Sequence, residues 1–179
     1  MTATIRRATP ADLDAIMALE HASFPRDAWS EQQMAAELRS RPSYYIVAED
    51  GGAVVGYAGF MSLEGGSDGD VQTIAVAEAA RGTGLGRALF TELLDEARRR
   101  GVTDVFLEVR EDNPVAQSMY RAFGFEHIAT RPRYYQPDDV DALVMRRQSA
   151  SPVAPAASRP GGTGAVGSEA VGPADGDLA

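Results

Sequence analysis

The stretch that decides the fold is residues 74–87, which read IAVAEAARGTGLGR. A strand-like run, Ile74–Val76, leads into a turn with three glycines, and a long helical pattern follows. Glycine lets the backbone adopt positive φ and approach a ligand closely, and the free N–H groups at a helix start attract phosphate oxygens. The spacing G-x-G-x-G matches neither the dinucleotide motif G-x-G-x-x-G nor the P-loop, which needs Lys-Ser/Thr. The stretch therefore predicts a phosphate-binding turn of another kind, or a turn in which glycine only relieves steric crowding.

Strand and helix patterns alternate on both sides of this turn. Leu85, Leu89, Leu93 and Ala97 recur every four residues, which predicts an amphipathic helix over 87–100. The other expected helices are 10–21, 30–39 and 113–124, and the expected strands are 3–7, 44–49, 53–62, 71–76, 103–110, 125–130 and 142–147. The order β-α-α-β-β-β-α-β-α-β-β predicts an α/β (α+β) layout around one mixed sheet.

Composition sets the size and class of the protein. The 179 residues are 44% hydrophobic, enough for one domain, but residues 149–179 are mostly Ala, Gly, Pro and Ser. We expect a folded domain over 1–148 and a disordered tail over 149–179. With no cysteine and only two histidines, we expect no disulfide and no metal site. The net charge of −9 argues against nucleic-acid binding and suits a cationic substrate, and the lack of a long apolar run predicts a soluble, cytoplasmic protein without membrane contact.

The glycine turn resembles a known signature. Arg81-Gly82-Thr83-Gly84-Leu85-Gly86 is similar to the Arg/Gln-x-x-Gly-x-Gly/Ala pyrophosphate motif of the GCN5-related N-acetyltransferases (GNAT), and the likeness extends over residues 1–148. It implies the GNAT acyl-CoA N-acyltransferase fold, a mixed, mostly antiparallel sheet flanked by helices, with acetyl-CoA as cosubstrate. One departure is Val76–Arg81, which reads VAEAAR where the family branch that this chain resembles usually shows Val-x-Pro-x-Tyr-Gln before the glycines.

A second run narrows the resemblance to one branch of that family. Phe106–Arg110 (FLEVR), Asn113, Tyr120 and Phe123–Phe125 are similar to the RimI group, which acetylates the N-terminal alanine of ribosomal small-subunit protein eighteen. The resemblance therefore implies a peptide α-N-acetyltransferase that acts on a protein N-terminus, with a ribosomal protein as the expected partner.

Amine acetylation needs a base and an acid. An α-ammonium with a pKa of about 7.7–8.0 must lose a proton, and the departing thiolate gains from receiving one. The resemblance assigns Glu108 as the base, acting through a water, and Tyr120 as the acid. From the residues alone, Glu108 could equally be a solvent-facing strand acid, and Tyr120 could be a core tyrosine beside a stripe of Val115, Met119 and Phe123.

The remaining site residues follow from the same comparison. The N–H of Val76 is expected to polarise the acetyl carbonyl, and Asn113 to cap its helix, contact the cofactor, or both. The residues expected to bind the cofactor are Ile74, Ala75, Val76, Arg81, Gly82, Thr83, Gly84, Leu85, Gly86, Arg87 and Asn113. The residues expected to line the peptide site are Trp29, Arg133, Tyr134 and Tyr135, unless the tyrosine-rich loop only packs.

Two other functions fit the same motifs. The acceptor could be a lysine side chain or a small amine, although a lysine pKa near 10.4 would demand more of the base. A coenzyme-A-binding module without catalysis would need neither Glu108 nor Tyr120, so the presence of both favours an enzyme.

Overall fold

The computed structural model describes residues 3–149 of the chain. The predicted tail lies outside this range except for Ser149. The elements are β1 (Thr4–Arg7), α1 (Leu13–Ser23), α2 (Glu31–Glu37), β2 (Ser43–Asp50), β3 (Ala53–Met61), β4 (Asp68–Val76), α3 (Leu85–Arg99), β5 (Asp104–Arg110), α4 (Pro114–Ala122), β6 (Glu126–Tyr135) and β7 (Val140–Gln148), with short 3-10 turns at Pro10–Asp12 and Glu78–Ala80. The predicted order and the α/β class are confirmed.

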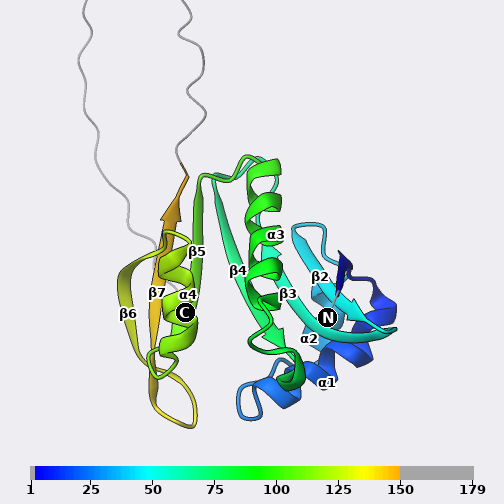
Figure 1. Ribbon diagram of the computed structural model, residues 1–179. Helices are drawn as coiled ribbons and strands as arrows, with labels where there is room; N and C mark the ends of the chain where they lie inside the picture. Colours follow the sequence, from blue (N-terminus) through cyan, green and yellow to red (C-terminus); the bar gives the residue numbers. More distant parts are fainter. Residues whose placement is uncertain (1–2, 150–179) are drawn as a thin grey trace, which may run out of the picture.

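A single seven-stranded sheet organises the described chain. Its strand order is β1-β2-β3-β4-β5-β7-β6, and every neighbouring pair is antiparallel except β4 and β5, which run parallel. β4 and β5 lie side by side at one end and diverge toward the other (Figure 1). The sheet is therefore split along its middle.

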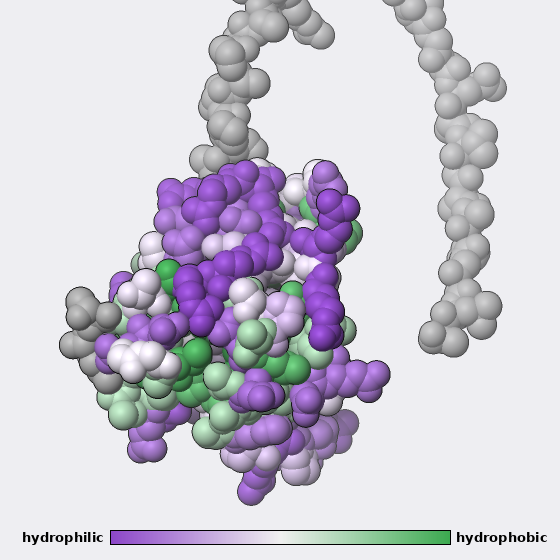
Figure 2. Space-filling model, turned by 90° about the vertical axis from the view of Figure 1, so that its right-hand side faces the viewer, coloured by the Kyte–Doolittle hydropathy of each residue, from purple (hydrophilic) through white to green (hydrophobic). Residues whose placement is uncertain are grey.

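Helices cover both faces of the sheet. On one face α1 and α2 enclose a core that includes Ile16, Met34 and Tyr57. On the other face α3 and α4 enclose a larger core, to which Leu89, Phe90 and other α3 side chains at helical spacing contribute. The side of the molecule that carries α1, α2 and β2 has polar side chains over its upper part and apolar ones gathered toward its middle (Figure 2).

Two strands extend well beyond the sequence-based expectation, while most other boundaries shift by only a few residues. β4 begins at Asp68 rather than Val71, because Asp68–Val71 pairs in register with Asp104–Leu107 of β5. β6 continues to Tyr135, past the predicted end at Thr130, because its pairing with β7 resumes at Tyr135 after an irregularity. Both changes place polar or aromatic side chains beside the split. No helix within residues 3–149 combines the length and apolar character that crossing a bilayer requires.

Candidate active site

The split between β4 and β5 leaves backbone groups of β4 without a strand partner. Pairing of the two strands ends at Val71 and Leu107. Farther along β4, the Ala77 N–H donates to the Val55 carbonyl at 2.9 Å, and Gly56 lies opposite Val76. Because hydrogen-bonded pairs alternate along an antiparallel ladder, the N–H groups of Ile74 and Val76 point away from β3 and into the split.

The glycine turn lies at the end of the split, at the start of α3. Gly82 and Gly84 have φ of +75° and +88°, and the space beside each is open. An L side chain at either position would be strained, so glycine is required by the backbone itself. The Arg81 Nε donates to the Val76 carbonyl at 3.1 Å, which ties the turn to β4.

Two adjoining cavities run along this side of the split. One of about 540 Å³ is bordered by Arg81, Arg87 and the three glycines of the turn, beside the N-terminus of α3. The free N–H groups of that helix end and the two guanidinium groups favour an anion. The second, of about 620 Å³, is bordered by Ile74–Val76 and by Asn113, whose side chain also caps α4 by accepting the Ala116 N–H at 3.1 Å.

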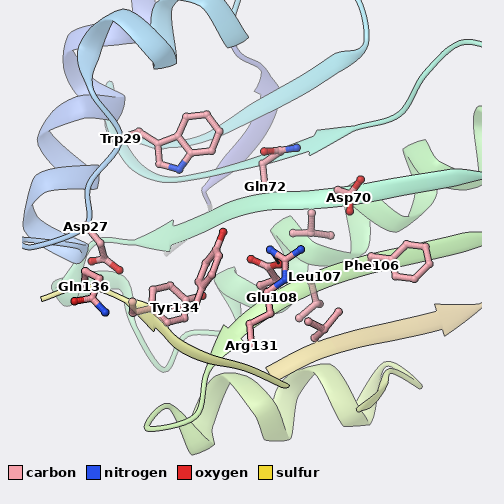
Figure 3. A pocket seen from close by; sticks show the side chains of 13 residues that line it. Asp27, Trp29, Asp70, Gln72, Phe106, Leu107, Glu108, Arg131, Tyr134 and Gln136 are labelled. Atoms are coloured by element: carbon pink, nitrogen blue, oxygen red, sulfur yellow. Dashed lines mark ion pairs between the residues drawn. The ribbon is translucent and has the colours of Figure 1, made fainter. Parts of the chain in front are cut away.

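A third cavity opens on the other side of the split. Its volume is about 660 Å³, and it lies between the loop that carries Trp29 and the end of β6. Figure 3 shows Trp29 and Tyr134 on its walls, with Glu108 and Arg131 close together beside Tyr134. The residues that border it are Asp27, Trp29, Asp70, Val71, Gln72, Phe106, Leu107, Glu108, Arg131, Tyr134, Tyr135, Gln136 and Val144.

Glu108 lies where the cavities meet. On β5 it alternates with Leu107 and Val109, which are buried under α3 and α4, so its carboxylate faces the opposite side. It borders the 620 Å³ and 660 Å³ cavities and also a central cavity of about 130 Å³ between them. Its Oε1 forms an ion pair with the Arg131 Nη1 at a distance of 2.7 Å. Burial first, and then the Glu108 carboxylate, raise the pKa of the neighbouring Tyr134 phenol.

Tyr120 reaches the same meeting point from α4. Its ring packs against Phe90 and Phe125, with centroid distances of 5.0 and 6.3 Å, and the side chain borders both the central and the 620 Å³ cavities. Burial raises the pKa of Tyr120 to about 12, so the phenol is protonated at neutral pH. The prediction that Val115 belongs to the core-facing stripe of α4 was wrong. Val115 is 80% exposed, and Gln117 is buried beside Tyr120 instead.

Most predicted site residues come together around the split, and three do not border a cavity. Thr83 donates its hydroxyl to the Ala80 carbonyl at 2.7 Å and so shapes the turn, while Leu85 points into the core. Arg133 lies at the irregularity of β6 with φ of +52°, and its N–H donates to Asp141 at 2.8 Å. These three residues support the surrounding backbone.

The structure adds charged residues that sequence reasoning missed. Arg131 and Asp27 border the 660 Å³ cavity, and Asp27 lies 3.7 Å from the Arg110 guanidinium. Glu20 borders the central cavity from α1, where it continues the apolar spacing of Leu13, Ile16 and Met17. A carboxylate in a core-facing position was the available signal for Glu20, whereas no local pattern identifies Arg131.

The arrangement is suited to transfer of a group between two ligands. One ligand with an anionic end can lie along the split, and a second can enter from the 660 Å³ cavity. The two meet between a carboxylate and a protonated phenol, which are a candidate base and acid.

Comparison with known proteins agrees with this geometry. Residues 13–125 match the model of the acetyltransferase (GNAT) family. The N-alpha-acetyltransferase RimI of Mycobacterium tuberculosis is 42% identical over 152 residues, which cover 83% of this chain and 94% of that protein. An uncharacterized protein of Mycobacterium leprae is also 42% identical, over 79% of this chain, but the match spans only 39% of that longer protein.

Solved structures show the same fold. The ribosomal-protein-S18-alanine N-acetyltransferase of Escherichia coli superimposes with a TM-score of 0.73 and 29% identity, over 82% of this chain and 94% of that one. The yncA protein of Salmonella typhimurium, solved with its cofactor acetyl-CoA, gives a TM-score of 0.73 and 28% identity over 88% and 100% of the two chains.

Proposed function

Since this chain belongs to the GNAT acetyltransferase family and is an N-acetyltransferase, we propose that its acceptor is the N-terminal α-amine of a protein, in the first place the N-terminal alanine of ribosomal protein bS18. The relatives named for this activity support the choice of acceptor. The observation that carries the proposal is the position of Glu108, which borders the cavities on both sides of the split and the central cavity between them.

The residues along the split fit acetyl-CoA. Two backbone N–H groups, of Ile74 and Val76, face the gap and can pair with the amide-containing arm of the cofactor as an added strand would. The open turn at Gly82 and Gly84, with Arg81 close by, suits a pyrophosphate. When bound, acetyl-CoA supplies the acetyl group as a thioester.

Glu108 acts as the base in this proposal. An α-ammonium is mostly protonated at neutral pH and needs a proton acceptor before it can attack. Because Arg131 engages Oε1, the Oε2 atom accepts the proton, directly or through one water. The N–H of Val76 polarises the carbonyl that is attacked.

Tyr120 acts as the acid. Its phenol is neutral, and its place beside the central cavity lets it donate its proton toward the departing sulfur. Trp29, Tyr134 and Tyr135 form the walls between which the acceptor peptide lies.

Mass spectrometry of synthetic peptides tests the acceptor. A peptide with the first residues of bS18 should gain one acetyl group at its α-amine. The same peptide with a blocked N-terminus and an added lysine should gain none. Acetylation of the lysine peptide at a comparable rate would refute the α-amine assignment.

Substitution of Glu108 tests the mechanism. Glu108→Gln keeps the size and hydrogen-bonding reach but removes the basicity, so kcat/KM should fall by about 10²–10⁴. Part of the loss should return between about pH 6 and 9.5, because more of the amine is then unprotonated. A wild-type rate in this variant would exclude Glu108 as the base.

A further inference from the structure

Glu20 is a buried carboxylate that the reaction as proposed does not use. It lies in the last two turns of α1 and is 1% exposed. Its Oε1 accepts the backbone N–H of Trp29 at 2.9 Å, and its Oε2 accepts the hydroxyl of Tyr57, which also contacts the Thr73 hydroxyl at 3.2 Å. None of the ion pairs formed among residues 3–149 includes Glu20.

This environment is unfavourable for an isolated charge. A buried carboxylate stabilised only by neutral donors loses hydration that no cation replaces. Burial and then the hydrogen bond with Glu20 raise the pKa of Tyr57, so this phenol stays protonated and remains the donor of the pair. An apolar residue would fit the core-facing spacing of α1 without this cost, so the position of Glu20 calls for a ligand that compensates its charge.

The central cavity offers the place for such a ligand. About 130 Å³ in volume, it has three carboxylates on its wall, those of Glu20, Asp27 and Glu108, and none of the described residues that border it is Lys or Arg. Outside the cavity, Glu108 pairs with Arg131 and Asp27 with Arg110. Glu20 is the carboxylate of this wall whose charge lacks a cation within residues 3–149.

The cavity is also the meeting point of donor and acceptor. Tyr120 and Ile74 border it from the split, and Trp29 borders it from the side of the 660 Å³ cavity. Glu108 borders both this space and the 660 Å³ cavity, so a primary ammonium that enters from the 660 Å³ cavity can reach the central cavity alongside Glu108.

We propose that Glu20 binds the acceptor's α-ammonium in the central cavity, beside Glu108. This inference rests on the proposed α-amine acceptor and adds a division of labour to it. Glu20 selects and holds the cationic form of the amine, and Glu108 then takes the proton. The hydrogen bond from the Trp29 N–H to Glu20 couples this binding to the position of the loop that carries Trp29.

Calorimetry with a charged and an uncharged peptide tests the assignment. The protein is saturated with free coenzyme A, which has no acetyl group to transfer, and is titrated at about pH 6.5, where the α-amine is mostly protonated. One peptide begins with a free alanine amine, and the other is the same peptide acetylated at that amine. Glu20→Gln should raise the Kd of the free-amine peptide by about tenfold or more, and the Kd of the acetylated peptide by less than about twofold.

The outcomes separate charge recognition from a structural role. Equal weakening of both peptides would mean that Glu20 only holds the Trp29 loop, and unchanged binding of both would overturn the proposal as well. Tyr57→Phe, the matched control, removes a donor to Glu20 but keeps the charge, so the ratio of the two Kd values should stay at the wild-type value.

Two further arms keep the test decisive. If Glu20→Gln does not fold, Glu20→Asp keeps the charge and withdraws it by one methylene. In that variant the free-amine peptide should still lose several-fold more affinity than the acetylated one, and an unchanged ratio overturns the proposal. Wild-type protein that neither binds nor acetylates the free-amine peptide would refute the α-amine function itself, independently of Glu20.

Discussion

Replacing Tyr120 by Phe removes one hydroxyl from the point where the cavities meet. Burial raises the pKa of this phenol to about 12, and within residues 3–149 no charged group or hydrogen bond adds to that shift. The hydroxyl therefore does little for folding, and the melting temperature should change by less than about 2 °C. We therefore expect loss of the Tyr120 hydroxyl to lower the catalytic rate rather than the stability of the fold.

The size of the effect has a lower and an upper bound. A hydrogen bond to a charged group contributes ~1.5–3 kcal/mol, which corresponds to about 10- to 150-fold in rate. Full general-acid catalysis contributes about 10²–10⁴. A thiol has an ordinary pKa of about 8.5, but burial in the same cavity raises it and brings it closer to that of Tyr120. We therefore expect kcat to fall by at least about tenfold, with the KM for acetyl-CoA little changed.

The assay follows release of the coenzyme A thiol with a thiol reagent. The chain has no cysteine, so the enzyme adds no background signal. Because Tyr120 acts in its protonated form and its pKa is about 12, wild-type activity should show no decline from this group below about pH 10.5. A phenol of ordinary pKa would begin to lose activity near pH 9.

The matched control is Tyr45→Phe, the same chemical change at a buried tyrosine that borders none of the four cavities described around the split. It should keep wild-type kcat. A Tyr120→Phe enzyme within twofold of wild type, or equal losses in both variants, would refute the assignment of Tyr120 as the acid.

Three further predictions concern stability and cofactor binding. The buried Tyr45 hydroxyl has no hydrogen-bond partner among residues 3–149, so Tyr45→Phe should raise the melting temperature by about 2–4 °C, and calorimetry showing a decrease would contradict this. A Cβ on Gly86 would meet only Val76 Cγ2 at 3.8 Å, so Gly86→Ala should fold normally yet weaken acetyl-CoA binding by about 5- to 150-fold; unchanged affinity would remove Gly86 from the cofactor site. Hydrogen bonds from Arg6 lower the pKa of Asp12 to about 2, so this pair stabilises the fold above about pH 4 and is lost as pH falls from 4 toward 2. Asp12→Asn should therefore cost about 1–2 kcal/mol at pH 7 and almost nothing near pH 2, as denaturant titrations at the two pH values would show.

Local patterns predicted the framework of this fold well. The leucine spacing of α3 depends on residues close in sequence, and the helix formed close to its expected range. The structure shows equally local features at the other elements: a capping box at Ser30 starts α2, and Gly51-Gly52 turns β2 into β3, close to the expected ranges of these elements. The alternation along β5 also placed Glu108 on the correct face. Short-range periodicity carries such information because it decides which side of an element is buried.

Contacts between distant segments were not predictable in this way. Arg131 meets Glu108 because β6 and β5 flank β7, and nothing in either strand specifies that pair. The helical spacing of α4 suggested a buried Val115, but Val115 borders the open cavity beside the split and has no sheet to cover it. The opposite happened at Glu20. A single acid in an otherwise apolar helix stripe is usually exposed at the surface, whereas Glu20 is buried.

The parallel pairing of β4 and β5 has a mechanical consequence. Within the described sheet, four residue pairs, from Asp68–Asp104 to Val71–Leu107, join β1–β4 to β5–β7, so this short segment sets how the two halves of the sheet are paired. Gly69 lies in that paired segment, where a Cβ would come within 2.4 Å of Phe60 Cζ. A larger residue at Gly69 would therefore disturb the pairing of β4 with β5, and we expect such a substitution to change the distance between Val76 and Glu108 at the open end of the split.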